Sequence, residues 1–524
     1  MAKGIFIGIG GTGQRVAEAL AYLAAAGVVR DDLPVILLDR DRKHGNRTQT
    51  ARQVRSLAAI RTARGSEGGG LFRGSLTTAN DESGTDDSLS FSNLHRFRDL
   101  SHDGVAALAN ILFDENDWDM DFANGYLGKA HVGSLDVIRC LDEAWTEVEK
   151  EIKDVQDTHQ GKPVPVVLCG SIFGGMGASS LPAIARWLRD PDRGDLTEKV
   201  RLHALMFGPY FTWRTSADEE DGAAGRPENA MGPDPKELFG AAHLALSHYV
   251  REGEDLPFDV QFLLGSEELA PTGKRVAPGG DAQFNHPHVV ELAGAMAISA
   301  ILESGDYSQE NGWYHAGGMK AELPNDKGLH RLGWEDIPGV KQFDQLPFRR
   351  GLSNLLVASL LHLGWLLPEL QEYEKKAARK PRWVRLVEGA SRKKGALNSS
   401  DLVHLDAFFL RALEWAAEMR TWHGSVRLFD LGRWEGGLRE LVQGSSGGVA
   451  DREENLCHLP FLGIGPFKPG SRGAAVMGQI LGRVRFSRIF DNPVDAYLGL
   501  LERCANRFYD QCLAEKGAER EDWL

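Results

Sequence analysis

The first regular element of the chain reads Gly4-Ile-Phe-Ile-Gly-Ile-Gly-Gly-Thr-Gly-Gln14, and this segment indicates the fold class. An apolar run that ends in glycines is typical of a buried parallel strand. Residues 14–26 then carry Ala, Leu, Glu and Val at helical spacing, and Pro34-Val-Ile-Leu-Leu-Asp39 is a second apolar run. This strand–helix–strand order predicts an α/β fold with a doubly wound, Rossmann-like parallel sheet, which binds ligands at the carboxyl ends of its strands.

Composition limits the function classes that the chain can belong to. Its 524 residues include 60 Lys and Arg against 74 Asp and Glu, a net charge of −14, and 42% are hydrophobic, as in globular proteins. The acid excess argues against nucleic-acid or anionic-membrane partners, although local basic patches remain open. Five cysteines without metal-ligand spacing indicate a reducing compartment.

Neither a leader nor a membrane span is expected from the sequence. A strand follows Met1 almost directly, and the most apolar stretch, 355–367, is shorter than the ~20 residues that cross a bilayer. The sequence therefore predicts a cytoplasmic protein with no nucleic acid and no membrane as partner.

The glycines after the first strand predict a phosphate-binding turn. In Gly8-Ile-Gly10-Gly11-Thr12-Gly13, the missing side chains let backbone N–H groups approach an oxyanion, and the following helix N-terminus adds partial positive charge. The spacing of these glycines also matches the dinucleotide fingerprint, and Asp39 stands where a ribose-binding acid would be. This turn alone allows three interpretations: a tight turn without a ligand, an NAD(P) site or a nucleoside triphosphate site.

A second glycine-rich turn favours a nucleoside triphosphate. Residues 163–168 predict another buried strand, which leads into Ser171-Ile-Phe-Gly174-Gly175-Met176-Gly177-Ala178-Ser179-Ser180 and then a helix. A NAD fold uses one such fingerprint, whereas two turns that converge on one ligand suit a triphosphate held without a Walker lysine. The sequence contains no GxxxxGK[ST] motif, which disfavours the P-loop class.

The order and spacing of five segments resemble the tubulin/FtsZ superfamily, specifically its divergent bacterial tubulin-like branch. GIGGTGQ (8–14) is similar to its first phosphate loop, and LLDRDRK (37–43) is similar to the segment that follows its second strand. NGYLGKAHVGSLDVIRCLDEAW (124–145) is similar to its third loop with the following helix. GSIFGGMGASS (170–180) is similar to its signature glycine loop, and FGPYF (207–211) to its fifth loop. The resemblance covers about residues 1–300. Phe173 and Met176 depart from the signature glycine and threonine.

The resemblance implies that GTP or GDP binds, with Mg²⁺, but no metal site made of protein ligands. The nucleotide-binding residues that it implies are Gly10, Gly11, Thr12, Gly13, Gln14, Asp39, Gly128, Lys129, Gly174, Gly175, Met176, Gly177, Ala178 and Ser179, with Asn229 at the base. It further implies a central helix at about 235–251 and head-to-tail self-assembly. Catalytic polar groups would come from the next subunit, at Asn285 and Glu291. Glu291 is equally interpreted as an acid that stabilises the start of a helix.

The expected organisation has three parts. Residues 1–250 are the GTP-binding domain, 251–340 carry the hydrolysis loop, and 341–524 are a divergent, mainly helical region that mediates assembly or contacts a partner protein. The sequence thus predicts a tubulin-like GTPase that hydrolyses GTP at a head-to-tail interface. Two alternatives stay open: a non-hydrolysing nucleotide-binding scaffold, for example in a bacterial defence system, and an NAD(P)-dependent oxidoreductase, for which no catalytic pair stands out.

Overall fold

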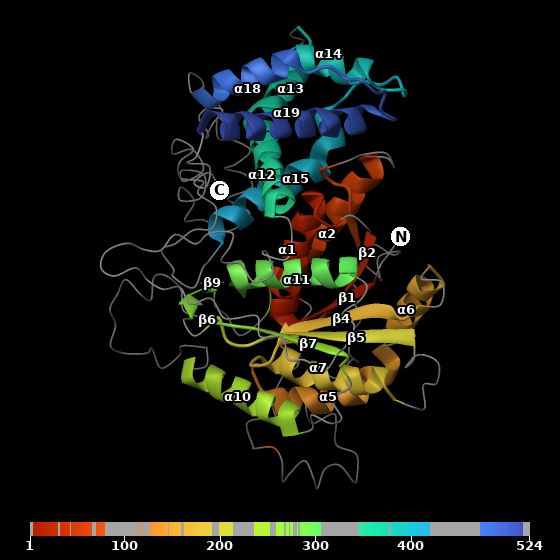
Figure 1. Cartoon of the computed structure of the whole chain (residues 1–524), viewed down its shortest axis with the longest axis vertical. Helices are drawn as coiled ribbons and strands as arrows, with labels where there is room; N and C mark the ends of the chain where they lie inside the picture. Colours follow the sequence, from red (N-terminus) through yellow and green to blue (C-terminus); the bar gives the residue numbers. More distant parts are fainter. Residues whose placement is uncertain are drawn as a thin grey trace, which may run out of the picture.

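A six-stranded parallel sheet forms the centre of the N-terminal part of the chain (Figure 1). Its strands, in the spatial order β3-β2-β1-β4-β5-β7, are β3 (Ser75–Thr78), β2 (Asp32–Leu38), β1 (Ile5–Ile9), β4 (Val164–Ser171), β5 (Val200–Phe207) and β7 (Val260–Leu264). Every neighbouring pair is parallel. The chain runs outward from β1 in one direction and from β4 in the other, so the topological switch point lies between these two strands. The predicted α/β sheet is confirmed.

The inner strands are buried along almost their whole length because helices cover both faces of the sheet. In β1, all five residues of the sequence IFIGI are buried, and β4 and β5 are buried except for one half-buried residue each. The edge strand β7 differs, because Gln261 and Leu263 are exposed. Short strands add two small pairs, β6 (Phe211–Thr212) with β8 (Ala270–Pro271) and β9 (Gly273–Arg275) with β10 (Phe284–Asn285).

Helices divide between the two faces of the sheet (Figure 1). On one face lie α1 (Gly10–Ala25), α2 (Gly45–Arg64) and α11 (Val289–Ser304), and on the other lie α5 (Ala130–Ala144), α7 (Gly175–Leu188) and α10 (Pro235–Arg251), while α6 (Thr146–Thr158) follows α5. The expected central helix, 235–251, is α10, which connects β5 to β7 on the face of α5 and α7. The helix between the sheet and the C-terminal helices is instead α11, which follows the last strand.

The C-terminal part, where the structure describes it, is helical, as expected. Its elements are α12 (Gln345–Leu361), a π-helical turn (His362–Leu366), α13 (Leu367–Lys376), α14 (Arg382–Gly389), a short 3₁₀ turn (Ser399–Leu402), α15 (Val403–Glu418), α18 (Arg472–Arg483) and α19 (Pro493–Lys516). These helices share one hydrophobic core with the sheet domain. Tyr22 of α1, for example, packs on Phe408 and Trp415 of α15, with ring centroids 5.5 and 4.7 Å apart.

One helical run is longer and more apolar than the sequence led us to expect. Residues 350–375 are long and apolar enough to span a membrane by length and composition, because the helix continues through the π-helical turn beyond the apolar stretch. However, 89% of its most apolar window is buried inside the protein. The buried His362 is satisfied there by the Tyr497 hydroxyl (2.8 Å) and the Asp406 carboxylate (2.7 Å). A buried core helix passes the same test, so this run is only a weak indication of a membrane span.

The structure describes residues 4–29, 32–41, 43–64, 70–78, 125–126, 128–144, 146–158, 162–190, 199–212, 235–251, 258–266, 269–271, 273–275, 283–304, 345–376, 379–419 and 472–516, with the single residues 113, 117 and 280. The expected domain boundaries at 250 and 340 border or fall in segments outside these ranges, so the three-part division stays a prediction.

Candidate functional site

The two glycine turns lie side by side at the switch point of the sheet. β1 and β4 are neighbours, with Gly8 opposite Cys169, and a Cβ atom on Gly10 would lie 3.2 Å from the Cβ of Met176. α1 begins at Gly10 and α7 begins at Gly175. The N-cap residues Ile9 and Gly174 have no side-chain oxygen that could cap these helices, and neither first turn holds an acid. Two helix N-termini therefore offer backbone N–H groups at the carboxyl ends of β1 and β4, an arrangement that suits an anion.

The glycines in these turns serve two different purposes. A Cβ atom on Gly13 would lie 2.6 Å from the Gly8 carbonyl carbon, and one on Gly177 would lie 2.2 Å from the Ser171 oxygen. These two positions need glycine because each helix packs directly on backbone. At Gly11 the closest atom is Arg15 Nη1, at 3.4 Å, so packing alone does not require glycine there. Gly11 is thus the better candidate for contact with a ligand.

A third loop joins the second glycine turn. A Cβ atom on Gly175 would lie 3.1 and 3.2 Å from the backbone nitrogens of Gly128 and Lys129. Gly128 has φ +84°, a left-handed conformation that favours glycine. The Lys129 ammonium forms an ion pair with Asp117 and its side chain is 35% exposed. The structure thus brings together three of the segments that the sequence predicted, although the ammonium group already has an anionic partner.

Gln14 and Asp39 form a buried polar pair beside the first turn. Gln14 Nε2 donates to Asp39 Oδ2 (2.6 Å), and the Asp41 N–H donates to Asp39 Oδ1 (3.1 Å). Burial, reinforced by the charge of Asp41, raises the pKa of Asp39 to about 7. Gln14 Oε1 is buried and has no hydrogen-bond partner among the residues that the structure describes. A ligand hydroxyl or N–H group would satisfy this oxygen, so the pair fits a nucleotide sugar or base.

Behind the first turn lies a buried ion pair that the sequence did not reveal. Arg15 donates through Nε to the Glu291 carboxylate, and both side chains are 2% exposed. The same carboxylate accepts the Tyr210 hydroxyl (2.6 Å) and the His288 N–H (2.8 Å). Burial is the largest single influence and lowers the pKa of Arg15, but the charges of Glu291 and Tyr210 and the hydrogen bonds to both groups together raise that pKa above its ordinary value. The guanidinium is therefore charged, with its charge compensated by Glu291.

The two predicted catalytic residues both have partners within their own chain. Glu291 accepts the N–H of His288 at the start of α11, which is the helix-start contact that its position indicates. The backbone of Asn285 pairs with the Asn46 amide (2.9 and 3.0 Å), and its side-chain oxygen accepts from Gln283 (3.0 Å). Action on a neighbouring subunit requires an exposed group, whereas these residues are 2% and 3% exposed. Their catalytic role stays a prediction, and Asn229 lies outside the described residues.

Met176 and the serines after it do not supply a free hydroxyl in place of the threonine that the resemblance led us to expect. Ser179 Oγ donates to the carbonyls of Gly175 (2.7 Å) and Met176 (3.0 Å), and Ser180 Oγ lies 3.7 Å from Met176 Sδ. Both hydroxyls thus face their own helix. His44, which the sequence did not single out, lies 3.7 Å from the Cβ position of Gly11. Burial, with the nearby charges of Arg15 and Arg47, lowers the pKa of His44 to about 3, so this side chain is neutral.

Fold and site together define an α/β protein whose three loops converge at the switch point of a doubly wound sheet. No protein-family model matches the sequence, and no curated protein matches it. Among solved structures, the chain is similar to CetZ from Methanosaeta thermophila, with a TM-score of 0.27 and 12% identity over 58% of this chain and 55% of that chain. The match thus spans about half the length of that protein. A TM-score this low does not establish a common fold.

Proposed function

We propose that this chain is a cytoplasmic, tubulin-like GTP-binding protein that self-assembles. The observation that carries the proposal is the convergence of two uncapped helix N-termini, those of α1 and α7, at adjacent strands. One such terminus suffices for a single phosphate group, whereas two that face one ligand suit the chain of charges in a nucleoside triphosphate. The third loop adds the Gly128 N–H beside the second turn, whereas the Lys129 N–H already donates to the Tyr126 oxygen (2.8 Å).

Each part of the site has a role in this proposal. The N–H groups of Gly10 to Gly13 and of Gly175 to Gly177 bind the phosphates, whereas the Ala178 N–H already donates to the Gly174 oxygen (3.1 Å). The Gln14 side-chain oxygen, with Asp39, binds the sugar or base. Among the described residues, no group of three or more His, Cys, Asp or Glu is arranged to hold a metal ion. Mg²⁺ would therefore be held largely by phosphate oxygens and water, which is its usual preference.

Hydrolysis, in this proposal, is completed between subunits. The resemblance puts the water-orienting acid on a loop after the central helix. In this proposal α11, rather than the segment 235–251, takes the part of that helix, because it follows the last strand. The loop would then lie in 305–344, outside the described residues. Glu291 would serve instead to hold Arg15 under the first turn. Glu291→Gln then destabilises the protein by about 3–5 kcal/mol, because it leaves a buried guanidinium unpaired, whereas a purely catalytic role would leave stability unchanged and lower only turnover.

The nucleotide content of the purified chain tests the proposal directly. We expect chromatography of the denatured protein to release GDP or GTP. The Gly11→Val variant should lose GTP affinity by roughly 10- to 100-fold in calorimetry, because a side chain displaces phosphate from the backbone N–H groups. Gly240→Val is the matched control, since a Cβ atom there meets nothing within 4 Å. Equal GTP affinity in both variants would contradict the site.

Self-assembly is tested by sedimentation and by turnover. We expect GTP to increase the pelleted fraction relative to GDP, and specific GTPase activity to rise with protein concentration, because dilution separates subunits. A head-to-tail contact does not close on itself, so a broad distribution of oligomers is expected rather than a dimer. A monomer with concentration-independent turnover would contradict assembly, and assembly without turnover would favour the non-hydrolysing scaffold.

An NAD(P)-dependent oxidoreductase is the second candidate, and one observation favours it. The strand order of the sheet and the acid at the end of β2 are those of dinucleotide-binding domains. Against it, the second glycine turn, at the N-terminus of α7, would have no role. Release of NAD(P) rather than guanine nucleotide from the purified protein would establish this candidate.

A further inference from the structure

The C-terminal part of the sequence carries an excess of basic residues. Residues 1–344 hold 34 Lys and Arg against 52 Asp and Glu, a net −18, whereas residues 345–524 hold 26 against 22, a net +4. Within the C-terminal part, the segments 379–394 and 483–491 together contain ten basic and two acidic residues. We call their exposed or half-exposed basic residues the basic cap: Arg379, Arg382, Arg385, Arg392, Lys393, Lys394, Arg483, Arg485 and Arg488.

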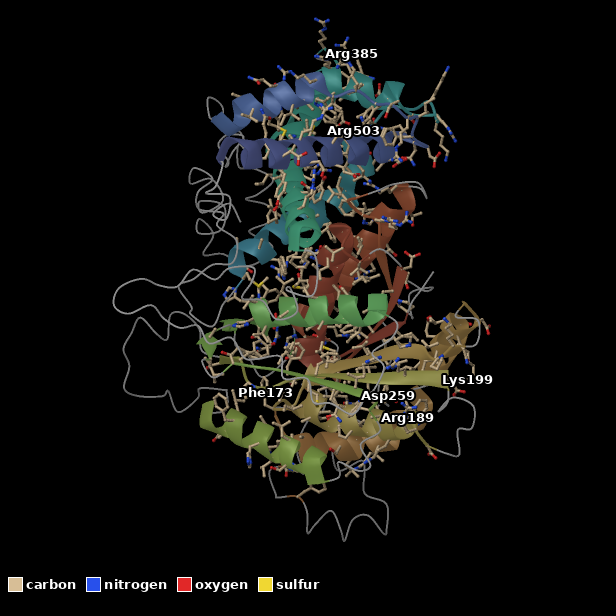
Figure 2. All side chains as sticks on the ribbon, viewed as in Figure 1. Phe173, Arg189, Lys199, Asp259, Arg385 and Arg503 are labelled. Atoms are coloured by element: carbon tan, nitrogen blue, oxygen red, sulfur yellow. The ribbon has the colours of Figure 1, made fainter. Side chains whose placement is uncertain are left out.

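The helix α14 presents part of this cap because it is amphipathic. Trp383, Val384 and Val387 are buried, and Trp383 packs on Tyr497 of α19 with ring centroids 5.5 Å apart. Arg382 and Arg385 are on the exposed side of the same helix. Figure 2 shows Arg385 at the outermost end of the molecule, far from the sheet. Packing of the buried side therefore turns the side that carries these two arginines outward.

The two segments of the cap form one surface. The N–H of Arg392 donates to the Phe490 oxygen (2.8 Å), and the N–H of Lys393 donates to the Asp491 oxygen (3.2 Å). The two acidic residues of these segments, Glu388 and Asp491, each have a basic neighbour. Glu388 accepts two bonds from Lys380 (2.7 and 2.9 Å), and Asp491 lies 3.7 Å from Arg392. The surface therefore has an excess of positive charge.

An exposed apolar side chain distinguishes this surface from an ordinary charged one. Ile489 is 62% exposed and lies between Arg488 and the bridge to the loop at 391. The aromatic rings nearby already carry cations of the chain itself: Arg488 lies over Phe490 (4.4 Å) and Arg503 over Phe486 (5.3 Å). Nucleic-acid bases stack on free aromatic faces. An apolar residue among basic ones instead suits the interface of an anionic bilayer.

We propose that the basic cap docks this protein on membranes that contain anionic lipids, with Ile489 entering the interfacial region. Each basic residue close to such a surface raises the partition constant about fivefold. Several of the cap residues acting together would therefore give salt-sensitive, reversible binding. The overall acid excess does not prevent this, because charges more than about 10 Å from the surface are largely screened at moderate salt.

Vesicle flotation with the full chain tests the proposal. We expect binding to vesicles made of equal parts phosphatidylserine and phosphatidylcholine at about 50 mM salt, strong loss of binding at about 300 mM salt, and no binding to phosphatidylcholine alone. The double variant Lys393→Glu with Lys394→Glu should lower the partition constant by about 25-fold or more. Its matched control, Lys150→Glu with Lys153→Glu, reverses the same number of charges on exposed positions of α6 and should bind as wild type does.

A second variant separates the apolar contribution from charge. Ile489→Ser should lower the partition constant about three- to tenfold at every salt concentration, because it removes an apolar side chain and no charge. All these positions are exposed, so unchanged thermal melting is expected for each variant. Binding that is absent from anionic vesicles at low salt, or equally reduced in the α6 control, would overturn the proposal. So would duplex DNA that binds more tightly than the vesicles and depends on the same lysines, since the partner would then be nucleic acid.

Discussion

The two anion sites that we propose, one at the carboxyl ends of β1 and β4 and one at the basic cap, would attract anions by different physical means. At the carboxyl ends of β1 and β4 the positive potential comes from backbone N–H groups at two helix N-termini, while the side-chain cation nearby, Arg15, is compensated by Glu291. At the cap it comes from exposed side chains such as Arg385 and Lys394. The affinity of a site made of backbone N–H groups depends on ångström-scale packing. The affinity of a site made of surface charges depends on the number of these charges. Substitutions should therefore have large, position-dependent effects at the first and small, additive effects at the second.

The largest effect is expected within the second glycine turn. Gly177→Ala puts a Cβ atom 2.2 Å from the Ser171 oxygen, so the strand-to-helix connection must shift. We expect a loss of about 3 kcal/mol or more in the free energy of unfolding. Gly11→Ala, with its closest atom at 3.4 Å, should fold normally. Urea denaturation of the two variants measures the contrast, and equal stability would mean that both turns tolerate a side chain alike.

The next largest effect concerns the contact between the sheet domain and the C-terminal helices, and whether these two parts unfold together. Arg411 of α15 donates to Glu18 of α1 (2.8 Å) and to Glu418 (3.3 Å), and all three side chains are buried. Arg411→Met should cost about 3–5 kcal/mol because it leaves buried carboxylates unpaired. Lys153→Met, which breaks an exposed pair with Glu149, should cost less than about 1 kcal/mol. Two separate thermal transitions in the wild-type protein would show that the regions are independent.

Asp39 gives a smaller effect that depends on pH. Its pKa in the folded protein is about 7, raised by burial and by Asp41, and near 4 in the unfolded chain. The folded state therefore binds the proton more tightly, so the stability that this group contributes is complete below about pH 4 and is lost as the pH rises to about 7. Asp39→Asn should be more stable than wild type at pH 8, by an amount on the order of a few kcal/mol. If the free energy of unfolding of the two proteins changed with pH in the same way, the raised pKa of Asp39 would be contradicted.

The smallest effect is expected in the basic cap. Arg385→Ala removes an exposed side chain, and it should change the free energy of unfolding by no more than about 0.5 kcal/mol. Thermal melting against the wild type measures this change. A larger loss would mean that cap residues contribute to folding, and the contrast with the glycine turns would then be weaker than we propose.

The local sequence predicted the glycine turns well because their signals are short-range. Strands that end in glycine and lead into a helix specify their own turns, whereas the third loop was expected only from the resemblance. Local sequence does not show which of two apolar helices lies between the sheet and the C-terminal helices. The segments 235–251 and 289–304 are both apolar helices in the sequence, and only the pairing of β7 with β5 shows that the first is a crossover helix.

The sequence by itself determined the α/β class, the two turns and the helical character of the C-terminal part, because each is specified by neighbouring residues. Tertiary structure alone decided which charges meet. Arg15 and Glu291 are 276 positions apart, and Arg411 and Glu18 are 393 positions apart. From the sequence, a polar residue in a helix is predicted to face solvent. Only the tertiary structure shows whether a distant element covers it. The basic cap likewise exists only because Arg392 and Phe490 lie side by side, a contact that no local pattern encodes.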